Sequence, residues 1–383
     1  GEADHPNLAC PSTTCTRCRW GSRSSELGVS VDDLYSALVT DAEKQADNWN
    51  LQGRQTEVWK KYGYVPADIW EPSGANTKQA SRSVEVCSAF DLNYMLTSQK
   101  YAFGDFCISQ VAKGLNKTED YEKYTKRASN FINSWDPSVS INGHAGFIQN
   151  RFQNGTFNYT DPRHCSIHDP LHSTCYLNAV NTDGFYESSP IVYVPHDTAK
   201  LIELQGGKDK FVKRLDWIFE KGYFDVSNEP SQQMPFMYHY ADQPAKSTRR
   251  SRHVISQYYN LTDTGIPGND DSGAMASYAA FYLLGLYPLP ATRQVLLSSP
   301  WFPTINITNA FTNTTTTIHA INFQEQGAVY VQNVTINGEP WKSRCWLDWS
   351  VFEQGGVVDL VLGKDDGLAC GELPASLSTG GYA

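Results

Sequence analysis

The chain has 383 residues, of which 40% are hydrophobic and 19% charged, and its net charge is −10 with a pI near 5.4. This length and apolar content exclude a disordered chain and predict a globular protein of about two domains. Lys and Arg are clustered in the sequence at residues 246–250 alone, so we expect no nucleic-acid partner. No apolar run reaches about 18 residues, so we expect no membrane span.

The first predicted helices are recognised by their caps. Ser30 and Asp33 form a capping box, which predicts the start of a helix that carries Leu34, Leu38 and Val39. The carboxylate of Asp197 can cap a second helix, which ends at Gly206-Gly207. Both belong to a part of the chain, up to about residue 290, in which helical periodicity dominates.

Two further helices are predicted from their apolar residues. One carries a stripe at helical spacing that stops at Gly222 and consists of Phe211, Leu215, Ile218 and Phe219. The other runs from Ala274 to Leu284, is almost wholly apolar and stops at Gly285. The stripe predicts an amphipathic helix, and the apolar segment predicts a buried one.

Beyond residues 288–290 the pattern changes to short runs rich in β-branched and aromatic residues, which predict strands. These runs are residues 304–308, 314–318, 329–331, 334–336 and 357–362. Asn337-Gly338 is a hairpin turn signal. We therefore expect a mainly α fold with a β-domain, divided into residues 1–290 and 291–383.

Sequons and cysteines indicate a secreted protein from an oxidising compartment. Residues 1–4 include neither an initiator Met nor a signal peptide, so a processed, soluble chain is expected. Cys15-x-x-Cys18 lacks the other ligands of a zinc site, so a disulfide or a free thiol is favoured there. Cys165 and Cys175 close a polar loop that a disulfide would hold. Seven sequons occur, at Asn116, Asn154, Asn158, Asn260, Asn306, Asn313 and Asn333.

A carboxylate with the properties of a general acid lies in residues 183–190. Glu187 follows Phe185 and Tyr186 and precedes Pro190, so we expect it to be partly desolvated. Desolvation raises a carboxyl pKa and keeps the proton near neutral pH, as a general acid requires. The alternative is an ordinary Glu on a surface loop.

Two more polar clusters interrupt the helical part. In residues 193–197, His196 precedes the capping Asp197, and a simple helix cap is the favoured interpretation of this cluster alone. Residues 227–233 collect amide and carboxylate oxygens, and calcium binds about six to eight such hard ligands. The alternative for the second cluster is a polar turn.

The fourth cluster, residues 268–273, places carboxylates directly before the apolar helix. There a helix N-terminus would stabilise Asp271 as the anion, which is the state of a general base. The alternative, in which Asp271 or Ser272 is the N-cap, does not exclude this role.

At these clusters the sequence resembles glycoside hydrolase family 92, the exo-acting α-mannosidases. Its local sequence is similar to that of the fungal members of the family. The motifs recur in the family's order over most of the chain, and together they are specific. They are Tyr64-Val65-Pro66, Ala80-Ser81-Arg82, Ser134-Trp135-Asp136-Pro137, Gly184-Phe185-Tyr186-Glu187, Val194-Pro195-His196-Asp197, Asn228-Glu229-Pro230-Ser231 and Gly268-Asn269-Asp270-Asp271.

The resemblance implies an (α/α)6 toroid, incomplete in this chain, followed by a small C-terminal β-sandwich. It implies that Glu187 is the general acid and Asp271 the general base of an inverting reaction on terminal α-linked mannose, with Ca²⁺ at the sugar. An α-1,2 linkage and mannose-containing N-glycans or mannosides are the expected substrates. The family often has a second Asp at the position of Asn269.

The remaining implied roles concern catalysis and binding. Asn269 and Asp270 are expected to be catalytic together with Glu187 and Asp271. Asn228, Gln232 and Asp271 would contact the metal ion. Residues expected to bind the substrate are His196, Asp197, Glu229 and Arg82.

Three departures from the family pattern accompany the resemblance. In the family, an N-terminal β-sandwich and the first helices of the toroid precede the segment at which this chain begins. A separate N-terminal fragment or second chain is therefore expected to complete the toroid. Only nine positions separate Glu187 from His196, and residues 87–101 look inserted. These departures keep open the alternative of a mannose-binding, lectin-like protein with impaired turnover.

Overall fold

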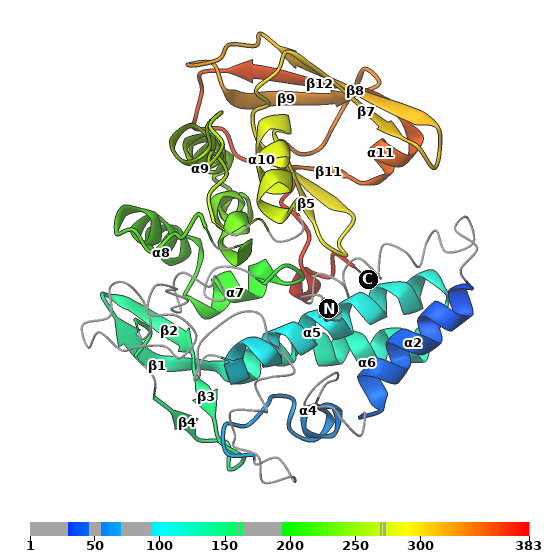
Figure 1. Cartoon of the computed structure of the whole chain (residues 1–383), viewed down its shortest axis with the longest axis vertical. Coiled ribbons are helices and arrows are strands. Elements are labelled where there is room, and N and C mark those ends of the chain that lie inside the picture. Colours follow the sequence, from blue (N-terminus) through cyan, green and yellow to red (C-terminus); the bar gives the residue numbers. More distant parts are fainter. Residues whose placement is uncertain are drawn as a thin grey trace, which may run out of the picture. The chain divides into compact units, whose positions relative to one another are not determined.

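The computed structural model describes residues 30–45, 55–69, 93–159, 161–163, 194–227, 229–268, 270 and 273–382. The chain divides into two compact units, Gly1–Tyr186 and Glu187–Ala383, which we describe one at a time (Figure 1). The predicted domain boundary between residues 290 and 291 stays a prediction.

Helices form most of the described part of the first unit. They are α2 (Val31–Glu43), α4 (Thr56–Tyr62), α5 (Asn93–Gly114), α6 (Thr118–Ala128) and the 3₁₀ helix η3 (Ser129–Ser134). The predicted cap is confirmed, because the Ser30 hydroxyl oxygen accepts a hydrogen bond from the Asp33 N–H at 3.2 Å. Leu38 of α2, Ile108 of α5 and Tyr124 of α6 meet in one buried cluster.

A buried ion pair joins these helices. The carboxylate of Asp105, which has no exposed surface, accepts hydrogen bonds from Trp59 Nε1 at 2.7 Å and from Arg127 Nε at 3.0 Å. Arg127 Nη1 also donates to Glu43 at 2.7 Å. α2, α4, α5 and α6 are therefore tied together through one guanidinium and two carboxylates.

Two hairpins in the first unit were not predicted. They pair β1 (Trp135–Ile141) with β2 (His144–Ile148) and β3 (Asn150–Arg151) with β4 (Phe157–Asn158). The first turn is Asn142-Gly143, at φ 54° and 81°, which is a recognised hairpin signal.

The helices of the second unit surround one buried 3₁₀ helix. η4 (Glu229–Ala241) is packed by α7 (Thr198–Leu204), α8 (Lys208–Glu220), α9 (Pro244–Tyr258) and α10 (Ala274–Leu284). Phe236 of η4 stacks on Tyr282 of α10 and on Tyr287 of strand β5 (Leu286–Leu289), with ring centroids 5.2 Å and 4.5 Å apart. η4 is thereby held at the centre of the helical part of this unit.

The predicted limits of α7, α8 and α10 are confirmed, but the predicted burial of α10 is wrong. Asp197 caps α7, and Gly285 ends α10 in the left-handed conformation at φ 69°. Only Met275 and Tyr282 of α10 are buried, whereas Ala276 and Ala280 are exposed. An apolar sequence predicts a face that can be buried, and the described residues leave one side of this helix in solvent.

Strands form the C-terminal part of the second unit, in two sheets. The three-stranded sheet has the order β11 (Trp346–Asp348), β6 (Gln294–Leu297), β5 (Leu286–Leu289). The five-stranded sheet has the order β10 (Glu339–Pro340), β9 (Tyr330–Ile336), β12 (Gly356–Gly363), β8 (Thr314–Ile321), β7 (Thr304–Asn309), seen side by side in Figure 1. The predicted strands and the Asn337-Gly338 turn are confirmed.

The apolar sides of these strands share one core, which includes Leu297, Ile318, Val334 and Leu360. β12 pairs in parallel with β8 and antiparallel with β9, so it is an inner strand. After β12 the disulfide Cys345–Cys370 holds the chain, and η6 (Leu377–Thr379) follows. This disulfide was not predicted from the sequence, and the expected Cys165–Cys175 pair lies outside the described residues.

Candidate active site

The second unit holds all the predicted site residues that the structure describes: His196, Asp197, Glu229, Gln232 and Asp270. The others, Glu187, Asp271, Asn269, Asn228 and Arg82, lie outside the described residues. Their roles therefore stay predictions.

Two predicted clusters meet at a glycine. Gly268 has φ +74°, and a Cβ atom there would lie 2.3 Å from the carbonyl oxygen of Ser227. The backbone at Gly268 therefore lies against the backbone at Ser227 as only glycine permits. The segment that leads to Asn269, Asp270 and Asp271 is thus adjacent to the segment that leads to Asn228 and Glu229.

A turn fixes the Ser227 side of this contact. The Ser227 N–H and hydroxyl both donate to Oδ1 of Asp225, at 2.8 Å and 2.6 Å. The turn brings the chain into η4 at Glu229. A local hydrogen-bonded turn and a close glycine contact together place the third and fourth clusters side by side.

Gln232 presents a buried oxygen beside this contact. Its Nε2 donates to the Val226 carbonyl at 2.7 Å, and because a carbonyl can only accept, this bond fixes which end of the amide is which. Gln232 has no exposed surface, and its Oε1 has no hydrogen-bond partner among the described residues. The backbone oxygen of Gln232 accepts from the Tyr282 hydroxyl of α10.

A buried acceptor without a partner costs about 1–3 kcal/mol, so such an atom points to a missing donor or cation. Amide oxygens are among the ligands that calcium takes, and they also accept from sugar hydroxyls. The position of Gln232 Oε1 fits either ligand. In the described ranges, His, Cys, Asp and Glu alone form no metal-binding group of three or more.

Asp270 places a carboxylate oxygen at the start of α10. The N-cap position is occupied by Gly273 at φ 80°, and Asp270 Oδ1 accepts from the Ala276 N–H at 3.0 Å. Burial, reinforced by the charge of Asp270, raises the pKa of Tyr259 to about 12. The N-cap is therefore Gly273 and neither Asp271 nor Ser272. The predicted role of Asp271 as a base stays a prediction, because Asp271 lies outside the described residues.

His196 and Asp197 lie at the start of α7 and are both buried, with 1% and 2% of their surface exposed. Asp197 Oδ1 accepts from the Lys200 N–H at 3.3 Å and from the N–H and hydroxyl of Ser378 at 3.2 Å and 2.5 Å. Burial raises the pKa of Asp197, although the bonds from Ser378 oppose it. The helix-cap interpretation of Asp197 is confirmed, and contact with substrate stays a prediction.

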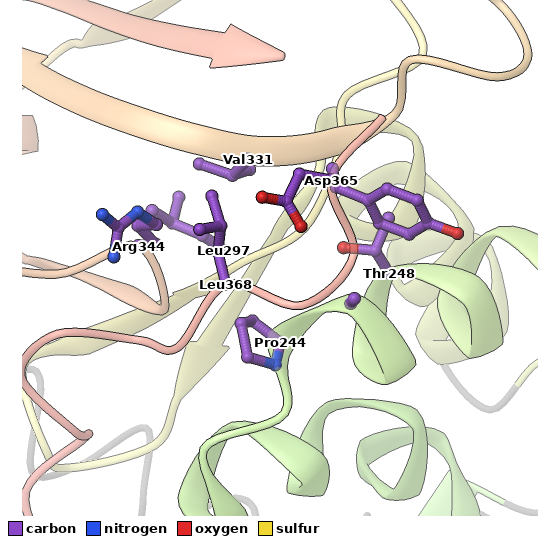
Figure 2. A pocket seen from close by; sticks show the side chains of 9 residues that line it. Pro244, Thr248, Leu297, Val331, Arg344, Asp365 and Leu368 are labelled. Carbon is purple, nitrogen blue, oxygen red and sulfur yellow. The ribbon is translucent and has the colours of Figure 1, made fainter. Parts of the chain in front are cut away.

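A small pocket, with a volume of about 10 Å³, lies between α9 and the five-stranded sheet (Figure 2). Its walls include Pro244, Thr248, Leu297, Val331 and Arg344. None of the predicted site residues lines it, so it gives no support to the candidate site.

No helix in the described part of the chain is both long and apolar enough to span a bilayer.

Comparison with known proteins identifies the family. A sequence profile of the glycosyl hydrolase family 92 catalytic domain matches residues 19–364. The chain belongs to glycosyl hydrolase family 92. The matched family-92 domain contains every predicted site residue.

A curated relative matches most of this chain in sequence. It is an uncharacterized secreted glycosidase of Arthroderma benhamiae, 36% identical over 368 residues, which are 92% of this chain and 45% of the relative. The family-92 chain therefore spans less than half the length of that protein.

Solved structures show the same fold. A family GH92 α-mannosidase from Bacteroides thetaiotaomicron has a TM-score of 0.74 and 22% identity, covering 95% of this chain and 44% of its own. An inverting family GH92 mannosidase from the same bacterium has a TM-score of 0.72 and 19% identity, covering 96% and 48%.

Proposed function

We propose that this family-92 chain carries the catalytic residues of a secreted, inverting α-mannosidase that removes terminal, α-1,2-linked mannose. The observation that carries the proposal is the contact of Gly268 with Ser227, because it makes the two metal- and base-bearing motifs adjacent. A Bacteroides relative of this fold has been solved in complex with mannoimidazole, which supports a mannoside as the ligand.

In the proposed reaction one carboxyl group acts as the general acid and another as the general base. Glu187 holds a proton and gives it to the glycosidic oxygen as that oxygen leaves. Asp271 removes a proton from water on the opposite face of the sugar, and the configuration at the anomeric carbon inverts. Asp270 accepts a hydrogen bond from the Ala276 N–H at the start of α10, and we propose that Asp270 and Asn269 assist Asp271 in catalysis.

We propose that Asn228, Gln232 and Asp271 hold Ca²⁺, which when bound would polarise the sugar hydroxyls it contacts. The buried Oε1 of Gln232 supports this assignment. His196, Asp197, Glu229 and Arg82 are proposed to hydrogen-bond the substrate. We further propose that a region outside this chain completes an (α/α)6 toroid and that the strand-rich part is a β-sandwich.

The test is turnover of an α-1,2-mannobiose by the protein that carries this chain, with the anomer of the released mannose read by NMR at early times. We expect β-mannose as the first product and loss of turnover after chelation. Release of α-mannose would contradict inversion, and binding without turnover would favour the lectin-like alternative.

Gln232→Met is expected to lower Ca²⁺ affinity on the order of 10-fold, because Met keeps the volume of Gln but offers only a weak thioether acceptor. The measurement is calorimetric titration with Ca²⁺. The control, Gln332→Met on β9, removes an amide that donates to Tyr330 O and Asp365 O and should leave the affinity unchanged. Equal affinities in both variants would remove Gln232 from the metal site.

Passage through the secretory pathway predicts N-glycans on this chain. All seven sequon asparagines are exposed in the structure. Asn154 shows the local geometry, since its Oδ1 accepts from the N–H and hydroxyl of Thr156, at 2.9 Å and 2.7 Å, and its amide nitrogen lies in an exposed side chain. Secretion and glycosylation together form this part of the proposal.

Enzymatic deglycosylation of the secreted protein is expected to convert sequon asparagines to aspartates, read by peptide mass spectrometry. Asn154→Gln should remove one glycan from the intact mass. Asn322→Gln, an exposed asparagine outside any sequon, is the control and should not change the glycan mass. Unmodified asparagine at all seven positions would contradict secretion by this route.

A further inference from the structure

The last described residues, 375–382, form a segment that we call the tail, and it lies beyond the matched family-92 domain, which ends at residue 364. The tail is fastened to β6. Gln294 Oε1 accepts from the Ala375 N–H at 2.6 Å, and Gln294 Nε2 donates to the Tyr382 hydroxyl at 2.9 Å. The disulfide Cys345–Cys370 holds the chain just before the tail. The tail is therefore a fixed part of the second unit.

From this anchor the tail contacts the start of α7. Ser376 Oγ accepts from the Ala199 N–H at 3.1 Å, which satisfies one of the free N–H groups of the first helical turn. The Leu377 N–H donates to the His196 carbonyl at 2.8 Å. The tail thus holds the main chain on both sides of Asp197.

Ser378 makes the contact that reaches a predicted site side chain. Its hydroxyl and N–H both donate to Oδ1 of Asp197, at 2.5 Å and 3.2 Å. The other donor to this oxygen is the Lys200 N–H, at 3.3 Å. Two of these three hydrogen bonds therefore come from a single tail residue.

The charge state of Asp197 depends on these bonds. Burial raises its pKa, and the bonds from Ser378 and Lys200 act in the opposite direction, toward the anion. The Lys200 side chain on α7 and Tyr382 in the tail also face this carboxylate. Removing the Ser378 hydroxyl removes one of the bonds that lower the pKa of Asp197, so the effect of burial raises this pKa further.

We propose that Ser378 is a positioning residue, which holds Asp197 and through it His196 in the geometry needed to bind a mannoside. This inference rests on the proposed function, because it assumes that His196 and Asp197 contact the substrate. α7 packs on η4, the helix that carries Gln232. A displacement of the first residues of α7 would therefore also displace the part of η4 that belongs to the candidate site.

Ser378→Ala is the test, made in the whole protein that carries this chain. We expect KM for an α-mannoside to rise on the order of 10-fold with kcat nearly unchanged, because binding geometry is lost while the acid and base remain. We also expect the loss of affinity on acidification to begin at a higher pH. Ser378→Thr keeps the hydroxyl and should restore both values.

Ser343→Ala is the matched control. The Ser343 hydroxyl donates to the Glu372 carbonyl at 2.6 Å, so this variant loosens the chain before the tail without touching α7. It should leave KM and the pH profile unchanged. A wild-type KM and pH profile in Ser378→Ala would overturn the proposal, and so would equal changes in Ser378→Ala and Ser343→Ala.

A wild-type protein without mannoside turnover would overturn the proposed function and not this inference about Ser378. Positioning is then read from the imidazole NMR signals of His196 as the pH is changed. Ser378→Ala must shift these signals and Ser343→Ala must not. Unshifted His196 signals in Ser378→Ala would overturn the positioning role by themselves.

Discussion

Glu187→Gln is expected to lower the turnover of an α-mannoside with a poor leaving group on the order of 10²–10⁴-fold. The amide has the shape of the acid but cannot deliver a proton to the glycosidic oxygen. A mannoside with an acidic phenol as leaving group needs little protonation and should lose far less rate. The measurement is kcat/KM for both substrates in the wild type and the variant.

The control for this variant is Glu203→Gln, on the exposed side of α7, where the carboxylate pairs with Lys200 at 2.5 Å. It should keep wild-type turnover on both substrates. Asp271→Asn should lose rate on both, since the water needs its base whatever the leaving group. An equal loss on both substrates in Glu187→Gln would show that Glu187 is not the general acid.

Arg127→Leu is expected to destabilise the first unit by about 3–5 kcal/mol, because it removes the guanidinium that binds both oxygens of the buried Asp105 carboxylate. Arg127 binds both oxygens of Asp105, at 3.0 Å and 3.2 Å, and also Glu43 at 2.7 Å. The measurement is the free energy of unfolding in guanidinium chloride. A loss below about 1 kcal/mol would show that the buried ion pair adds little.

The matched control is Lys123→Leu, in which the lost pairs, with Asp120 at 2.8 Å and Glu43 at 3.5 Å, lie near the surface. Exposed pairs of this kind contribute about 0–1 kcal/mol, so the control should unfold almost as the wild type does. Comparable losses in the two variants would contradict the argument from burial.

The same cluster sets a pH dependence. Burial opposes ionisation of Glu43, but hydrogen bonds and charges from Tyr124, Arg127 and Lys123 lower its pKa. A carboxyl whose folded pKa is lowered adds stability above its unfolded pKa and loses it as the pH falls through the folded pKa. The fall in unfolding free energy below pH 5 should therefore be less steep in Glu43→Gln than in the wild type.

Local hydrogen-bonding rules explain what the sequence predicted correctly. Ser30 and Asp197 cap their helices because a side-chain oxygen reaches an N–H three residues away, and Gly285 ends α10 because only glycine adopts its backbone angle without cost. The Asn337-Gly338 turn follows the same kind of rule. Caps and turns depend on a few consecutive residues, so they can be recognised directly in the amino-acid sequence.

Contacts between distant residues could not be predicted in this way. Ser378 and Asp197 are 181 positions apart, and neither carries a pattern that names the other. The same holds for the contact of Gly268 with Ser227 and for the disulfide Cys345–Cys370. The family resemblance named the site residues, and the fold was needed to show which of them share a location.

The strand order of the five-stranded sheet bears on how the chain is made. β12 lies between β8 and β9, yet it is the last strand of that sheet to be synthesised. Until residues 356–363 leave the ribosome, β8 and β9 each present an open edge of unpaired N–H and C=O groups. This stage is when the nascent protein is most exposed to aggregation, and chaperone binding there would protect it.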